Sequence, residues 1–235
     1  EPWAEAREAL RKNYGIEAQA EAGPALQRAQ IVVWAVKPQT FKDAAAQAKA
    51  HTQGALHLSV AAGIRSDSIA QWLGTERIVR TMPNTPALVG KGMSALYARP
   101  AVSAPERQSI EAIMATTGEF LWVDSEPQLD AVTALSGSGP AYVFYFLEAM
   151  TRAGTGMGLT EQQAHQLAVG TFVGASELAR RSDDPPSVLR QRVTSKGGTT
   201  YAALQSMEAD GVGAAFGRAM QAACQRADEL GNEFG

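Results

Sequence analysis

The chain has 235 residues, of which 45% are hydrophobic and 19% are charged, and its formal net charge is −3. That length is enough for one large domain or two modest ones, and the composition is typical of a globular protein. The sequence has no basic tract and no aromatic-rich basic face, so nucleic acid is not an expected partner. The longest apolar runs are too short to cross a bilayer, and the charged opening residues do not resemble a signal peptide.

The cysteine and histidine content argues against disulfides and metals. Cys224 is the single cysteine, which excludes an internal disulfide framework and is typical of a reducing cytoplasm. It lies in an expected helix, where packing is the favoured role over nucleophilic chemistry. The three histidines lack metal-ligand spacing, so no metal site is expected.

The first half of the chain alternates between helical and extended patterns. Helices are expected at residues 1–14, 23–29, 39–52, 65–74 and 105–118, with Gly15 ending the first and Ser66 or Asp67 capping the fourth. Strands are expected at residues 31–36, 55–60, 77–83, 92–98 and 119–124. The β-branched run at 31–36 is typical of a strand buried on both faces. This alternation predicts a doubly wound parallel sheet.

The second half of the chain is expected to be entirely helical. From Asp130 the sequence predicts a long helix interrupted at residues 136–140, and then helices at 159–182, 185–195, 200–211 and 211–231. Thr160 and Gln163 form a candidate capping box. Small residues that recur in these helices favour equally a compact bundle core and a helix-exchanging dimer interface. Proline and charge at residues 124–130 predict a boundary between domains 1–126 and 127–235.

One expected feature is missing. A dinucleotide-binding sheet normally opens with a strand, a G-x-G-x-x-G turn and a helix. The nearest glycine-rich stretches, "SGSGPA" and "KGGTT", lie in the helical half and follow no expected strand. Either the domain binds no nucleotide, or the chain begins after the first strand–turn–helix unit. The abrupt start with a helix favours the second alternative.

Four stretches have the residues and positions expected of a site. "AVKP" (residues 35–38) and "SVAAG" (59–63) follow expected strands, as does "RTMPNTP" (80–86). The charge of Lys37 suits a loop over a ligand, small residues let a flat ring lie against the backbone, and Asn84 can both donate and accept. "DAVTALSGSGPAY" (130–142) forms the fourth stretch together with "TSKGGTT" (194–200). For each stretch, the alternative interpretation is an ordinary turn that binds no ligand.

The stretch "TSKGGTT" gathers hydroxyl and backbone donors at a helix start. Thr199 or Thr200 capping the next helix is the reading that local sequence favours. The alternative interpretation is an anion-binding site, in which backbone N–H groups and hydroxyls hold a ligand such as a carboxylate.

In this order and spacing, the four stretches resemble the pyrroline-5-carboxylate reductase family. The resemblance runs from about residue 10 to the end of the chain, and the pair "ALSGSGPAY" and "TSKGGTT" is highly specific. It implies a Rossmann-like domain, incomplete at its start, followed by an all-α dimerisation and substrate domain. It also implies hydride transfer from NADPH, with NADH as the alternative cofactor, to the cyclic imine 1-pyrroline-5-carboxylate, which gives L-proline.

The resemblance assigns roles to particular residues. Thr133 would hydrogen-bond the imine nitrogen or an ordered water, as the catalytic contact. The substrate would be bound by Glu126, Ser136, Gly137, Ser138, Gly139, Ser195, Gly198, Thr199 and Thr200. The cofactor would be lined by Ala35, Val36, Lys37, Pro38, Val60, Ala61, Ala62, Met82, Pro83 and Asn84.

The family pattern also implies a homodimer with composite sites, in many members assembled further into a ring of dimers. Two positions depart from it: Ala22 stands where a cofactor-contacting Asn is common, and Lys196 stands where Pro is common. A chain that truly lacked the Gly-rich turn should bind its cofactor weakly. Two alternatives are a hydroxyacid dehydrogenase, for which the helical half offers only Lys196, and a non-enzymatic dimerisation module with a degenerate nucleotide domain.

Overall fold

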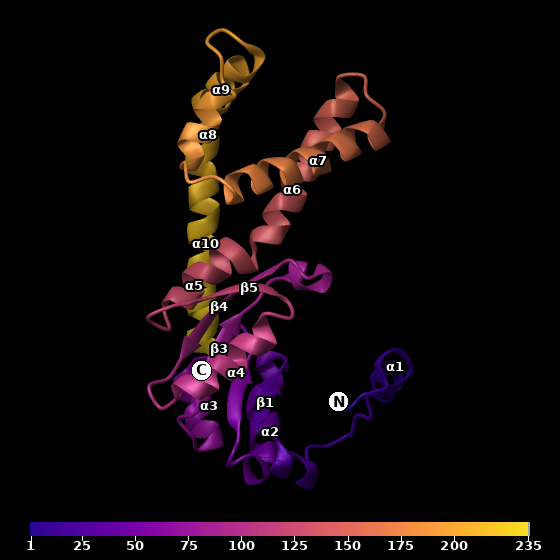
Figure 1. Ribbon diagram of the computed structural model, residues 1–235, viewed down its shortest axis with the longest axis vertical. Coiled ribbons are helices and arrows are strands. Elements are labelled where there is room, and N and C mark those ends of the chain that lie inside the picture. Colours follow the sequence, from indigo (N-terminus) through magenta and orange to yellow (C-terminus); the bar gives the residue numbers. More distant parts are fainter. Residues whose placement is uncertain (235) are drawn as a thin grey trace. The chain divides into compact units, whose positions relative to one another are not determined.

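The computed structural model describes residues 1–234, and the chain forms two compact units (Figure 1). The first unit comprises residues 1–137 together with the end of the chain from residue 223, and the second comprises residues 138–222. Residues 127–137 belong to the first unit because the helix at their start contacts two strands of the sheet. The boundary at residue 126 stays a prediction.

The first unit contains a five-stranded sheet with the strands in sequence order, β1 to β5. The strands are β1 (Ile31–Trp34), β2 (Leu56–Ser59), β3 (Ile78–Met82), β4 (Gly92–Ala98) and β5 (Gly118–Trp122). The helices and short turns of this unit are α1 (Ala4–Tyr14), η1 (Pro24–Arg28), α2 (Pro38–Ala48), η2 (Lys49–His51), α3 (Ser66–Leu73), η3 (Thr85–Val89), α4 (Ala104–Met114), α5 (Gln128–Val132) and the π-helical turn η4 (Thr133–Gly137). The predicted α/β sheet domain is confirmed.

Two details of the predicted sheet are wrong. Val33 of β1 is 51% exposed, so β1 is not buried on both faces; among residues 1–234 its neighbour in the sheet is β2. β4 runs antiparallel to β3, whereas the other three strand pairs are parallel. The short connection through η3 reverses the chain, and a parallel partner would need a longer crossover.

Side chains alternate across the strands and build a core on each face of the sheet. One core joins Trp34 and Ile78 to Phe41 of α2 and Ile69 of α3. The other joins strand residues to α4 and contains Leu56, Leu58, Val79, Leu96, Ile110 and Met114. Since residues two apart in a strand share a face, both faces of the sheet carry apolar side chains, and helices pack on each of them. The ends of the strands are left free for a site.

Helix ends follow the sequence signals in most places. Gly15 ends α1 in the left-handed conformation, as expected. The helix α3 is the exception: its N-cap residue is Arg65, and neither Ser66 nor Asp67 caps it with a side chain. The N–H of Ser66, the first of this helix, donates instead to the carboxylate of Glu126, a residue distant in the sequence.

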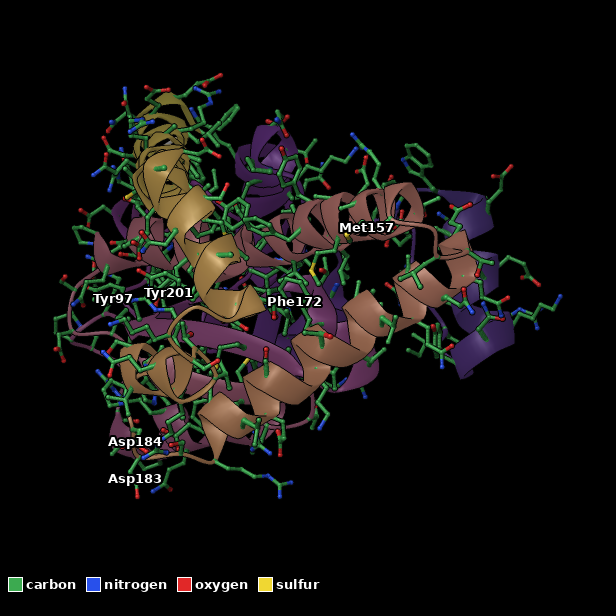
Figure 2. All side chains as sticks on the ribbon, turned by 90° about the horizontal axis from the view of Figure 1, so that it is seen from above. Tyr97, Met157, Phe172, Asp183, Asp184 and Tyr201 are labelled. Carbon is green, nitrogen blue, oxygen red and sulfur yellow. The ribbon has the colours of Figure 1, made fainter. Side chains whose placement is uncertain are left out.

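The second unit is helical. It contains α6 (Gly139–Gly156), α7 (Glu161–Arg180), α8 (Pro186–Arg192) and α9 (Thr199–Ala209), and the helix α10 (Val212–Phe234) begins in it. The Thr160–Gln163 capping box is confirmed at the start of α7, and Gly154 of α6 lies against Ala164. Met157, which is 80% exposed, marks the turn between these helices (Figure 2). Within residues 130–234 no strand occurs, and no helix there or earlier is long and apolar enough to cross a membrane.

Candidate active site

The loops after β1, β2 and β3 lie at one edge of the sheet, because these three strands are parallel neighbours. The predicted cofactor residues lie in these loops or directly at their ends, where Pro38 is the first residue of α2 and Met82 is the last residue of β3. They are Ala35, Val36, Lys37 and Pro38, then Val60, Ala61 and Ala62, then Met82, Pro83 and Asn84. In doubly wound sheets, ligands bind outside the carboxyl ends of the strands. The fold therefore brings the predicted cofactor residues together where such a ligand belongs.

Two hydrogen bonds fix the start of the loop after β2, one to the end of β1 and one within the chain around β2. The N–H of Val60 donates to the carbonyl of Trp34 at 3.1 Å, and the N–H of Ala61 donates to the hydroxyl of Ser59 at 3.3 Å. Lys37 is the N-cap of α2 and is exposed, and Pro38 occupies the first turn of that helix. The small side chains of Ala35 and Ala62 leave the backbone approachable.

The third loop is joined to the glycine-rich turn η4 by Asn84. Its amide Nδ2 donates to the carbonyl of Ser136 at 3.3 Å and to the hydroxyl of Ser136 at 3.2 Å. Its Oδ1 accepts the N–H of Met93 at 2.9 Å. Asn84 thus uses its donor and its acceptor to hold three chain segments together, within the first unit.

Gly137 fits closely against the same loop. A Cβ added at this residue would lie 2.4 Å from Cε of Met82. A larger residue at position 137 would push the methionine away, so the glycine permits the close approach of η4 to the loop after β3.

Thr133 stands at the start of η4 and is half-buried. Its hydroxyl donates to the carbonyl of Leu129 at 2.7 Å. A hydroxyl carries one proton, so Thr133 can offer only its lone pairs to any further partner. Widened π-helical turns of this kind occur frequently at functional sites.

Glu126 makes three short contacts inside the first unit. One carboxylate oxygen accepts the N–H of Ser66 and the guanidinium Nη1 of Arg80, and the other accepts the hydroxyl of Ser66, each at 2.6 Å. The side chains of Arg80 and Glu126 are 8% and 14% exposed. The sequence analysis expected Ser66 as a possible cap of α3 and gave Arg80 no role, so it missed the contacts of both residues with Glu126. The substrate contact expected of Glu126 stays a prediction.

Further charges surround this group. Burial raises the pKa of the Asp130 carboxyl, and the nearby Arg65 and Arg80 oppose that rise. Arg65 in turn pairs with Asp228 of α10 at 2.5 Å. No cluster of His, Cys, Asp or Glu suited to a metal ion occurs among residues 1–234.

In the helical unit, the donor stretch forms a tight turn before α9. Gly198 is the N-cap residue without a side-chain cap, and its N–H donates to the carbonyl of Ser195 at 3.0 Å. The expected capping by Thr199 or Thr200 is wrong, because both residues lie in the first turn of the helix. Ser195, Thr199 and Thr200 are exposed. The hydroxyls of these three residues are therefore accessible to a carboxylate, as the anion-site interpretation requires.

Ser138 and Gly139 lie at the start of α6, where Ser138 is the N-cap residue without a side-chain cap. Tyr201, the residue after the donor stretch, belongs to α9 (Figure 2).

Comparison with protein-family models matches two segments of the chain. Residues 126–230 match the model described as pyrroline-5-carboxylate reductase dimerisation. Residues 1–63 match the model described as NADP oxidoreductase coenzyme F420-dependent. The helical half is therefore a dimerisation domain.

Individual proteins extend these matches over the chain. The pyrroline-5-carboxylate reductase of Pseudomonas aeruginosa is 43% identical over all of this chain and 87% of its own length. A solved structure of a pyrroline-5-carboxylate reductase from Coxiella burnetii is 36% identical with a TM-score of 0.88, and the match covers 97% of this chain and 86% of that one. The Plasmodium falciparum pyrroline carboxylate reductase, solved with NADP bound, is 31% identical with a TM-score of 0.81, and covers 86% and 77%.

The resemblance that the four stretches suggested is confirmed at this level of identity, and neither alternative is favoured by it. The chain belongs to the pyrroline-5-carboxylate reductase family and is an NAD(P)H-dependent oxidoreductase that acts on a C=N bond.

Proposed function

We propose that this reductase binds NADPH along the sheet-edge loops and its imine substrate beside the turn η4, and produces L-proline from 1-pyrroline-5-carboxylate. The observation that carries the proposal is the link from Asn84 to Ser136, which holds a cofactor loop against that turn. Hydride transfer requires the cofactor ring and the imine carbon to lie face to face, so a rigid connection between their binding segments suits the reaction.

The residues at the sheet edge fit a dinucleotide. Ala35 and Ala62 have small side chains and are not buried, so a ribose or a flat ring can approach the backbone there, whereas Ala61 packs in the hydrophobic core beneath them. The N-terminus of the 11-residue helix α2, with Lys37 beside it, offers positive potential to a phosphate. The related Plasmodium enzyme was solved with NADP, which supports NADPH here, with NADH as the second candidate. When bound, this cofactor supplies the hydride.

The hydroxyl of Thr133 suits a protonated imine. Its proton is committed to the carbonyl of Leu129. Its lone pairs can therefore accept the N–H of an iminium, or an O–H of a water that bridges to the substrate, which stabilises the electrophilic, protonated form of the substrate. Ser136, Gly137, Ser138 and Gly139 would line the ring, and Glu126 would lie nearby.

The turn before α9 would hold the substrate carboxylate. Ser195 and Thr200 supply hydroxyls, and Thr199 supplies an N–H group at the positive end of an 11-residue helix. Gly198, whose own N–H is donated to the carbonyl of Ser195, shapes the turn that brings these donors together. A carboxylate accepts several such hydrogen bonds at once.

Assembly is proposed from the helical unit. The family's dimerisation model covers this unit, and many of its large apolar side chains are exposed, including Phe144, Tyr145, Leu167, Val173 and Leu178. We propose a homodimer in which each pocket draws on both chains, with a ring of dimers as a further assembly. The single cysteine fits a reducing cytoplasm.

Steady-state kinetics of Thr133→Val tests the assignment of the substrate site. Valine keeps the shape of threonine and removes the hydroxyl, so kcat/KM for 1-pyrroline-5-carboxylate should fall about 100-fold. Ser109→Ala is the matched control, since Ser109 makes the same kind of bond to a carbonyl four residues earlier on α4. A Thr133→Val enzyme with the activity of the control would refute the role of Thr133.

A further inference from the structure

Two of the loops proposed to line the cofactor share one structural support. The loop after β2 runs from Val60 to Arg65 and ends where α3 begins at Ser66. β3 ends at Met82, two residues beyond Arg80, and the next loop follows directly. Glu126 contacts both Ser66 and Arg80, although it is 60 residues from the first and 46 from the second.

The three contacts of Glu126 stabilise the start of α3 and the buried charge of Arg80. α3 has no side-chain cap of its own, and the Glu126 carboxylate accepts its first N–H group and the adjacent hydroxyl. A negative charge there also interacts favourably with the helix dipole. The same carboxylate neutralises the guanidinium of Arg80, which is almost fully buried and would be costly to leave unpaired.

The loop after β2 is also held from its other side. Gly63 has a φ of +73°, and a Cβ there would lie 2.9 Å from Cβ of Leu230 in α10. Arg65 pairs with Asp228 of the same helix at 2.5 Å. With α10 on one side and Glu126 at its end, this loop has few ways to move.

We propose that Glu126 is a positioning residue for the cofactor: it fixes the loops at residues 60–62 and 82–84 by capping α3 and pairing with Arg80. The inference rests on the proposed assignment of those loops to NADPH. It differs from a direct contact of Glu126 with the substrate, because the carboxylate already accepts three hydrogen bonds from Ser66 and Arg80 and acts through them.

Glu126→Gln and Ser66→Ala test the proposal by steady-state kinetics and by fluorescence titration with NADPH. We expect the KM and the Kd for NADPH to rise about tenfold in Glu126→Gln and less in Ser66→Ala, because one charge-assisted bond is worth roughly that factor. The KM for 1-pyrroline-5-carboxylate should not change. Ser66→Ala, which removes one hydroxyl, still decides the question if Glu126→Gln folds poorly.

Glu106→Gln is a matched control. Glu106 also accepts a serine N–H and hydroxyl, from Ser103, and pairs with an arginine, Arg77. Arg77 precedes β3 and lies at the opposite edge of the sheet from the loops. The control should lose thermal stability as Glu126→Gln does and should keep the NADPH KM of the parent.

Two results would overturn the proposal. A raised KM for 1-pyrroline-5-carboxylate with unchanged NADPH binding would make Glu126 a substrate contact. An equal effect of Glu106→Gln on NADPH would make the effect one of general stability.

Ala62→Glu separates this inference from the proposed function. If this charged, larger side chain leaves NADPH binding unchanged, the loop after β2 does not line the cofactor, and both proposals fail. If Ala62→Glu weakens NADPH binding while Glu126→Gln and Ser66→Ala do not, only the role of Glu126 fails.

Discussion

The indole Nε1 of Trp34 donates to Nδ1 of His57 at 3.0 Å, across the first two strands of the sheet. The two rings are also stacked, with centroids 5.9 Å apart, and Phe41 stacks on Trp34 at 4.9 Å. Because Nδ1 accepts this bond, the proton of the neutral imidazole belongs on Nε2. A protonated His57 would place a second donor against the indole N–H, inside the core.

This pair predicts a loss of stability in mild acid. Burial is the main cause that lowers the pKa of His57 to about 4, from 6.5. The unfolded chain then binds the proton more tightly than the folded one, so the free energy of unfolding should fall as the pH drops from 6.5 towards 4. The full loss would be about 3 kcal/mol.

Urea unfolding at several pH values checks this prediction. His57→Gln has no titrating group and can still accept from Trp34, so its stability should depend less on pH between 4 and 6.5. Equal slopes in the variant and the parent would show that His57 contributes nothing to the acid sensitivity.

A second prediction concerns Asn84, where two substitutions separate the contribution of its hydrogen-bond donor from that of its acceptor. Asn84→Asp keeps an oxygen for the N–H of Met93 but loses the donor to Ser136. Asn84→Ala loses both and should cost about 1–3 kcal/mol, because partly buried groups are left unpaired. Chemical denaturation measures the stability. We expect both variants to raise the KM for NADPH, and an unchanged KM in Asn84→Asp would contradict a role for the Ser136 link.

A third prediction concerns Gly118, where β5 begins beside β4. Its φ is +144°, and a Cβ there would lie 2.2 Å from the carbonyl oxygen of Gly92. Gly118→Ala should therefore cost more than about 3 kcal/mol, since backbone atoms of β4 would have to move. The comparison variant is Gly90→Ala, which has a positive φ of +68° and no atom within 4 Å. It should cost only about 1 kcal/mol, and similar losses in the two variants by thermal unfolding would count against the steric explanation.

The sequence predicted the elements well because their signals are local. The run at residues 31–36 marked a strand, and the Thr160–Gln163 pair marked a helix start, without reference to the rest of the chain. The antiparallel direction of β4 and the burial of β1 depend on which strands become neighbours. A short apolar run carries no such information, so the expected burial of β1 on both faces and the expected parallel direction of β4 were wrong.

The candidate site shows the same division. Sequence motifs identified Asn84 and Ser136 separately, but the hydrogen bonds between them join residues 52 positions apart. The contacts of Glu126 with Ser66 and Arg80 also have no local pattern, because serine is common at helix starts and arginine in a strand looks like a surface residue. Only the folded chain shows that these side chains meet.

The last prediction concerns the dimer and uses the long helix α7. Only Ala164 and Ala168 of this helix are buried, whereas Leu167 and Leu178 are 59% and 70% exposed. The two leucines are eleven residues apart, so at about 100° per residue they lie on the same side of the helix. A second chain that covers this side would remove both from water, and a glutamate at either position would be buried without a partner.

We therefore expect Leu167→Glu and Leu178→Glu to shift the mass measured by light scattering from dimer to monomer and to lower activity. Tyr14→Glu, at a residue of α1 that is 73% exposed, is the control and should remain dimeric. Dimers in both leucine variants would mean that the second chain lies elsewhere on the helical unit.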